Sequence, residues 1–162
     1  MKLHHKRIPE YPVWIASHLK KDNLGLPLPP RKPELRTPIY WLSSRGNELY
    51  FVNASHLVIE KLSSTATGWF TVDDEAMTTV ESGQYEYFNV LPNEAVLIES
   101  FDEMLDSDFN FQLSLHLVTT QYGHMQMLMP ISMENKLDIV LLWSNGDTHK
   151  LLGLQKHSPS HG

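Results

Sequence analysis

The chain has 162 residues, of which 41% are hydrophobic, and a formal net charge of -6. This length suffices for one main hydrophobic core, and the absence of cysteine excludes disulfides, thiolate nucleophiles and Cys-based zinc or iron–sulfur sites. No apolar run reaches the roughly 18 residues that a membrane helix needs. The start, MKLHHKRIPEYPVW, lacks the apolar region of a signal peptide, so we expect a cytoplasmic protein with no membrane contact.

Charge is divided unevenly along the chain. Residues 1–36 hold eight Lys and Arg against three Asp and Glu, a net of +5. The other 126 residues hold five bases and sixteen acids, a net of -11. A basic arm on an acidic body is therefore expected to associate with an acidic surface, on its own chain or on another.

The arm, residues 1–37, divides into two predicted pieces. Residues 12–23 are predicted to form a short helix, because Pro12 suits the first turn and Gly25 can close the carbonyl end. Residues 24–38 hold five prolines, which preclude a helix and favour polyproline II. The arm is then a spacer, a strap on the acidic body or a docking arm for another chain. Its candidate partner-binding residues are Trp14, Ile15, Leu19, Pro27, Pro30, Arg31, Lys32 and Arg36.

From Pro38 onward the apolar pattern changes to period two, which predicts a β domain over residues 38–156 and a flexible tail at 157–162. Two strands around an Arg-Gly-Asn turn are predicted in PIYWLSSRGNELYFVN, and a third in SHLVIEKLSS. The stretch FNFQLSLHLVTT alternates most regularly. Its apolar side chains point one way, and Gln112, Ser114 and His116 form a polar sheet face on the other.

The C-terminal stretch LDIVLLWSNGDTHKLLGL predicts a hairpin at Asn145-Gly146, because both residues tolerate positive φ. The apolar run 139–143 predicts a strand buried on both faces. Several short strands separated by turn residues favour an antiparallel sandwich or barrel. The pieces YFVNASHLVIEKLS and VLPNEAVLIES resemble Ig-like and fibronectin-type domains, which implies a mostly β, antiparallel β-sandwich.

Acidic residues gather in two stretches of the body. In ESFDEMLDSDF, Ser100 and Glu103 form a capping box, which predicts a helical turn that brings carboxylates together. Oxygen ligands of this kind suit Ca²⁺ or Mg²⁺, and an ordinary solvated acidic loop is the alternative. The residues of this candidate metal or acidic binding face are Asp73, Asp74, Glu75, Asp102, Glu103, Asp106 and Asp108.

Three further features each have a functional and a structural interpretation. His116 beside Ser114 could belong to a hydrolase, but the chain has no GxSxG motif, and a surface histidine is the alternative. Asn53-Ala54-Ser55 matches an N-glycosylation acceptor or forms a bend at a strand end. The methionines of GHMQMLMP form an adaptable binding surface or a soft core layer.

The charge division favours a non-catalytic adaptor or accessory subunit, which binds a protein partner or a second copy through the arm and the acidic face. A divalent-metal hydrolase or calcium-binding sandwich that uses the acidic loops is the second class. An acidic nucleic-acid mimic that inhibits a DNA-binding protein is the third. We expect the adaptor, without a cofactor. We also expect no direct binding of nucleic acid, because the body is acidic.

Overall fold

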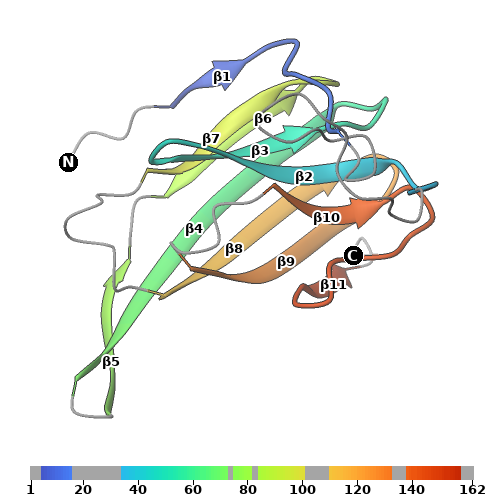
Figure 1. Cartoon of the computed structure of the whole chain (residues 1–162). Helices are drawn as coiled ribbons and strands as arrows, with labels where there is room; N and C mark the ends of the chain where they lie inside the picture. Colours follow the sequence, from blue (N-terminus) through green and yellow to red (C-terminus); the bar gives the residue numbers. More distant parts are fainter. Residues whose placement is uncertain are drawn as a thin grey trace, which may run out of the picture.

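Two antiparallel β-sheets make up the described part of the chain (Figure 1). The computed structural model describes residues 5–15, 34–72, 75–81, 84–100, 110–132 and 138–157. Its strands are β1 (Arg7–Ile8), β2 (Pro38–Arg45), β3 (Glu48–Asn53), β4 (Ile59–Val72), β5 (Glu75–Glu81), β6 (Tyr85–Val90), β7 (Ala95–Ser100), β8 (Asn110–Thr119), β9 (Gly123–Ser132), β10 (Ile139–Trp143) and β11 (Gly153–His157). The prediction of a mostly β, antiparallel fold is confirmed.

The five-stranded sheet, in the order β1-β7-β3-β2-β10, is buried on both faces at its centre. β2 and β3 form the predicted hairpin, which runs from Tyr40 opposite Asn53 to Arg45 opposite Glu48. Consecutive residues are buried in β2, β3 and β7. Because successive side chains of a strand point to opposite faces, this burial means that both faces of the sheet are covered.

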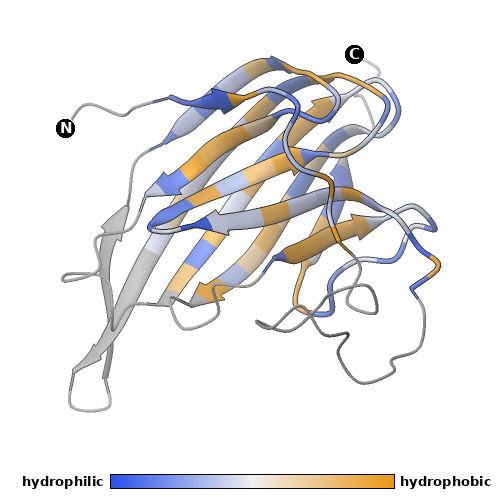
Figure 2. Ribbon diagram, turned by 45° about the horizontal axis from the view of Figure 1, so that its top comes forward, coloured by the Kyte–Doolittle hydropathy of each residue, from blue (hydrophilic) through white to orange (hydrophobic). Residues whose placement is uncertain are grey.

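The six-stranded sheet has the order β11-β9-β8-β4-β5, and β6 also pairs with β4. The predicted alternation of β8 is confirmed: Phe111, Leu113, Leu115 and Leu117 are buried and the residues between them are half-buried. The alternation appears as coloured bands along the strands (Figure 2). The three methionines of β9 are also buried, so they form a core layer. The hairpin of β4 and β5 extends beyond the other strands (Figure 1).

The buried residues of both sheets belong to one hydrophobic cluster. Two side-chain hydrogen bonds also cross from one sheet to the other. The Ser64 hydroxyl donates to the carbonyl of Ile98 at 3.4 Å, and the Tyr87 phenol donates to the carbonyl of Leu97 at 2.6 Å. Burial raises the pKa of Tyr87 to about 12, so this phenol stays a donor well above neutral pH.

The predicted short helix over residues 12–23 is not seen. Pro12 to Ile15 are not helical, and residues 16–23 lie outside the described part of the chain. Within the described residues, no helix is long and apolar enough to cross a membrane. Residues 5–15 instead contribute strand β1, and the side chains of Tyr11 and Trp14 pack on different strands. Packing against the body thus outweighs local helix propensity here.

The predicted hairpin at Asn145-Gly146 is only partly present. Gly146 has a φ of 93° and its N–H donates to the carbonyl of Trp143 at 2.9 Å, so the tight turn forms. Beyond the turn a single bridge joins Leu142 to Thr148, and the next strand, β11, pairs with β9 in the other sheet. Leu154, in the apolar run after the turn, is partly buried and packs against the core from the six-stranded sheet.

Candidate functional site

Residues 5–15, which we name the strap, are bound to the five-stranded sheet. Through β1 the strap extends that sheet beside β7, with Arg7 opposite Val96 and Ile8 opposite Ala95 (Figure 1). Two further backbone bonds fasten the strap. The Leu97 N–H donates to the carbonyl of Lys6 at 2.9 Å, and the Tyr11 N–H donates to the carbonyl of Asn93 at 2.8 Å. The strap is therefore part of the folded body.

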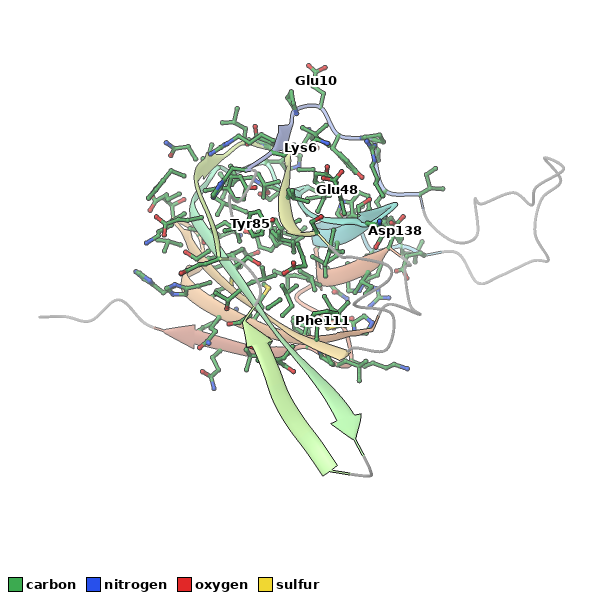
Figure 3. All side chains as sticks on the ribbon, turned by 90° about the vertical axis from the view of Figure 1, so that its left-hand side faces the viewer. Lys6, Glu10, Glu48, Tyr85, Phe111 and Asp138 are labelled. Carbon is green, nitrogen blue, oxygen red and sulfur yellow. The ribbon has the colours of Figure 1, made fainter. Side chains whose placement is uncertain are left out.

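The three described cations of the basic arm each pair with an acid of the body. Figure 3 labels one such pair, Lys6 of the strap and Glu48 of β3. The pairs are Lys6–Glu48 at 3.4 Å, Arg7–Glu94 at 3.0 Å and Arg36–Asp147 at 3.2 Å. Exposed ion pairs are weak, so the pair to Glu94, whose side chain is only 8% exposed, is the most sheltered of the three.

Tyr11 anchors the strap to the outer face of β2 and β3. Its ring lies 5.9 Å from the ring of Trp41 and 6.3 Å from that of Tyr50, measured between centroids. Its phenol oxygen is 2.6 Å from the hydroxyl of Ser43 in a buried hydrogen bond. The guanidinium of Arg45 covers the ring at 4.3 Å. Tyr11 is 6% exposed, so the strap contributes a core residue.

Trp143 at the end of β10 is contacted by one residue before and one residue after the segment 16–33, which lies outside the described residues. The ring of Trp14 meets it edge to face at 5.3 Å, and the guanidinium of Arg36 lies 4.1 Å from its centre. Arg36 also pairs with Asp147 and with Glu34, and its hydrogen bond with Glu34 raises its pKa above the usual value. We name Trp14, Arg36, Trp143 and Asp147 the Trp143 cluster.

Exposed apolar side chains flank the Trp143 cluster. Val13 and Ile15 are 84% and 55% exposed, and Leu35 is 91% exposed. These residues neighbour the anchored Trp14 and Arg36 in a non-helical chain, where successive side chains point in different directions. Fixing the anchors against Trp143 therefore leaves the neighbours in water.

Asn53 connects the end of β3 to the turn between β6 and β7. Its amide nitrogen donates to the carbonyls of Leu57, Val90 and Leu91 at 2.9, 3.1 and 3.3 Å. Its amide oxygen accepts from the N–H and the hydroxyl of Ser55. Asn53 is completely buried, so the strand-end bend is the right interpretation and its side chain is not accessible for glycosylation.

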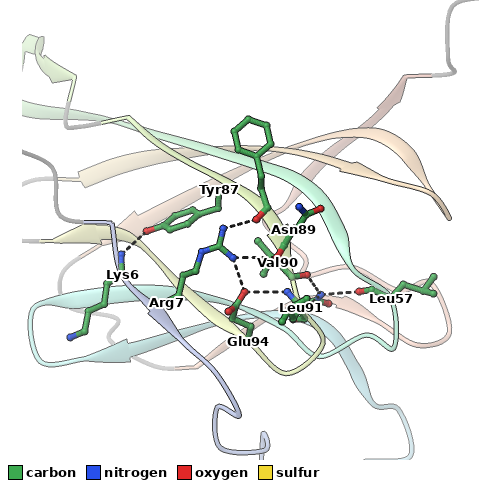
Figure 4. Close-up of polar contacts among 10 residues, drawn as sticks. Lys6, Arg7, Leu57, Tyr87, Asn89, Val90, Leu91 and Glu94 are labelled. Atoms are coloured by element: carbon green, nitrogen blue, oxygen red, sulfur yellow. Dashed lines mark hydrogen bonds and ion pairs between the residues drawn. The ribbon is translucent and has the colours of Figure 1, made fainter.

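Arg7 fastens the same turn to the strap (Figure 4). Its guanidinium donates to the carbonyls of Phe88 and Asn89 and to the carboxylate of Glu94. The carboxylate of Glu94 also accepts from the N–H of Leu91 at 3.1 Å. The strap and the turn therefore form one hydrogen-bonded unit.

The residues of the predicted polar sheet face lie on β8 of the six-stranded sheet. Gln112, Ser114 and His116 are half-buried and alternate with the buried residues of β8. His116 stands opposite Gln126, and its ring lies 5.6 Å from the ring of His124. Among the described residues, no three His, Cys, Asp or Glu side chains gather as a metal site.

Several predicted site residues lie outside the described part of the chain, and their roles stay predictions. From the arm these are Leu19, Pro27, Pro30, Arg31 and Lys32. From the acidic stretches they are Asp73, Asp74, Asp102, Glu103, Asp106 and Asp108. Glu75 begins β5 opposite Val72. Of the predicted arm residues, the structure brings Trp14 and Arg36 together on Trp143, with Ile15 next to them.

Sequence reasoning missed Tyr11 and Trp143 as anchors and Asn53 as a connecting residue. Tyr11 and Trp14 are aromatic residues in a segment that is otherwise basic and proline-rich. Their presence there was the sequence signal for an anchor. For Asn53, the signal was Ser55 two positions later, a spacing typical of side-chain turns.

Comparison with models of protein families, with curated proteins and with solved structures finds no match to this chain.

Proposed function

We propose that this chain is a non-catalytic protein-interaction module whose partner docks on the surface around the Trp143 cluster. The observation that carries the proposal is the exposure of Val13, Ile15 and Leu35 beside residues that are fixed against Trp143. Exposed apolar side chains that gather at one place mark interaction sites. Tryptophan and arginine are also the residue types most enriched at the energetic centres of interfaces.

The surface is organised before a partner arrives. Arg36 is held by the face of Trp143 and by two carboxylates, those of Glu34 and Asp147. Trp14 is held against Trp143 by an edge-to-face contact. Binding to fixed side chains loses less conformational entropy than binding to free ones, which favours affinity. The partner that fits is a protein segment with apolar side chains to cover Val13, Ile15 and Leu35.

A capture experiment with a double variant tests this function. Replacing Ile15 and Leu35 with serine removes exposed apolar surface, so folding should be unaffected and partner binding weakened. Burial of each side chain would contribute about 1.5–3 kcal/mol, so losing both weakens binding by about 100-fold or more. Full-length protein, the double variant and the control Leu151→Ser, whose native side chain is 54% exposed, are used to capture partners from the native cell.

We expect one protein to be retained by the wild type and by the Leu151→Ser control, and lost from the double variant. Equal retention by all three proteins would contradict docking at this surface. An unchanged unfolding midpoint in urea for the double variant ensures that the loss reports binding and not stability.

The finer parts of the sequence interpretation belong to this proposal. We propose that the two sheets form a sandwich in the style of Ig-like and fibronectin-type domains, supported by their shared core. We also propose a cytoplasmic location, with which the cysteine-free composition is compatible. The metal hydrolase and the nucleic-acid mimic remain alternatives that depend on the acidic stretches.

A further inference from the structure

The outer face of the six-stranded sheet brings together two histidines from neighbouring strands. In the ladder between β8 and β9, His116 stands opposite Gln126 and His124 stands opposite Val118. The two histidines are therefore diagonal neighbours on one face, a position from which long side chains reach each other. Their ring centroids are 5.6 Å apart with an interplanar angle of 34°.

We propose that His116 and His124 bind one Zn²⁺ ion between them. Zinc binds imidazole nitrogen at about 2.0–2.1 Å, so two rings on one tetrahedral ion have their centroids about 5 Å apart. The observed 5.6 Å is close to this value. Imidazole is a preferred ligand of Zn²⁺, and water completes the coordination.

The backbone beneath the two histidines is firmly held. β8 lies between β4 and β9, and the inward-facing neighbours Leu115, Leu117 and Met125 are fully buried. A site on central strands keeps its ligands in place better than a site on a loop.

One ion pair of the same sheet lies on strands β4 and β6. Lys61 of β4 stands opposite Val118 of β8, which lies between Lys61 and His124. Its ammonium lies 3.9 Å from the carboxylate of Glu86 on β6, which offsets its repulsion of a cation. The site differs in place and chemistry from the Trp143 cluster, so it goes beyond the proposed interaction function.

Calorimetric titration of the full-length protein with zinc chloride tests the proposal. The variants are His124→Ala, at an exposed position, and His116→Gln, which keeps a polar side chain of similar size. The matched control is His56→Ala, which removes an exposed histidine from the connection between β3 and β4. Zinc should also raise the melting temperature of the proteins that bind it, by mass action on the native state.

We expect the tightest zinc-binding event in the wild type and in His56→Ala, weakened by about 10-fold or more in each of the other two variants. Chemical shifts of the His116 and His124 rings should change with the same zinc dependence in the wild type. Zinc affinity in His124→Ala and His116→Gln equal to that of His56→Ala would overturn the proposal. Zinc-dependent shifts confined to other histidines would overturn it as well.

Discussion

Replacing Asn53 with alanine is expected to lower the free energy of unfolding by about 3 kcal/mol or more. The change removes the amide NH2 group, whose two protons are shared among the carbonyls of Leu57, Val90 and Leu91, at a completely buried position. A net hydrogen bond contributes about 1 kcal/mol, and a buried acceptor left without a donor adds about 1–3 kcal/mol. Urea unfolding of the variant and the wild type measures the difference.

The matched control for this prediction is Asn145→Ala. The side chain of Asn145 also makes hydrogen bonds, to the N–H and the carboxylate of Asp147, but in an exposed turn. Its loss should change the free energy of unfolding by less than about 1 kcal/mol. If both variants unfold at the same urea concentration, the Asn53 network does not hold the β6–β7 turn.

Replacing Tyr11 with alanine is expected to lower the free energy of unfolding by about 3–5 kcal/mol, as for other buried aromatic residues. The change empties a position that is packed between Trp41, Tyr50 and the guanidinium of Arg45. Tyr11→Phe keeps the ring and loses only the bond to Ser43, which should lower the free energy by about 1 kcal/mol. Thermal and urea unfolding of the two variants measure both effects.

The contrast between the two Tyr11 variants separates packing from hydrogen bonding. A large loss in Tyr11→Ala with a small loss in Tyr11→Phe is the pattern of a ring buried in the core. Loss of less than about 0.5 kcal/mol in Tyr11→Ala, the size seen at exposed positions, would mean that the strap is not docked.

The features predicted correctly from the sequence are those that short-range alternation determines. Residues 111–117 alternate apolar and polar, and β8 buries the apolar set. The run 139–143 is apolar without interruption, and β10 buries Val140, Leu141 and Leu142. The Arg-Gly-Asn turn forms with Gly46 at a φ of 59°. A strand exposes alternate residues to opposite faces, so such patterns can be read without knowledge of the partner strand.

The strap could not be predicted because contacts far apart in the sequence decide its conformation. Residues 12–23 carry local signals for a helix, but Tyr11 and Trp14 pack on residues more than twenty-five positions away. The charge division indicated an association between the basic arm and the acidic body. The charge division did not indicate which acids pair with the described cations. These acids lie outside the predicted acidic loops. Tertiary packing, not local propensity, selects such partners.

The proposed interaction surface requires the strap to be docked on its own chain, and amide hydrogen exchange tests this most directly. The Leu97 N–H donates to the carbonyl of Lys6 in the strap, and the Tyr11 N–H donates to the carbonyl of Asn93 in the body. Both amides should be strongly protected, and their protection should not change when the protein is diluted. Unprotected exchange at both positions, or protection that is lost on dilution, would contradict the docked strap.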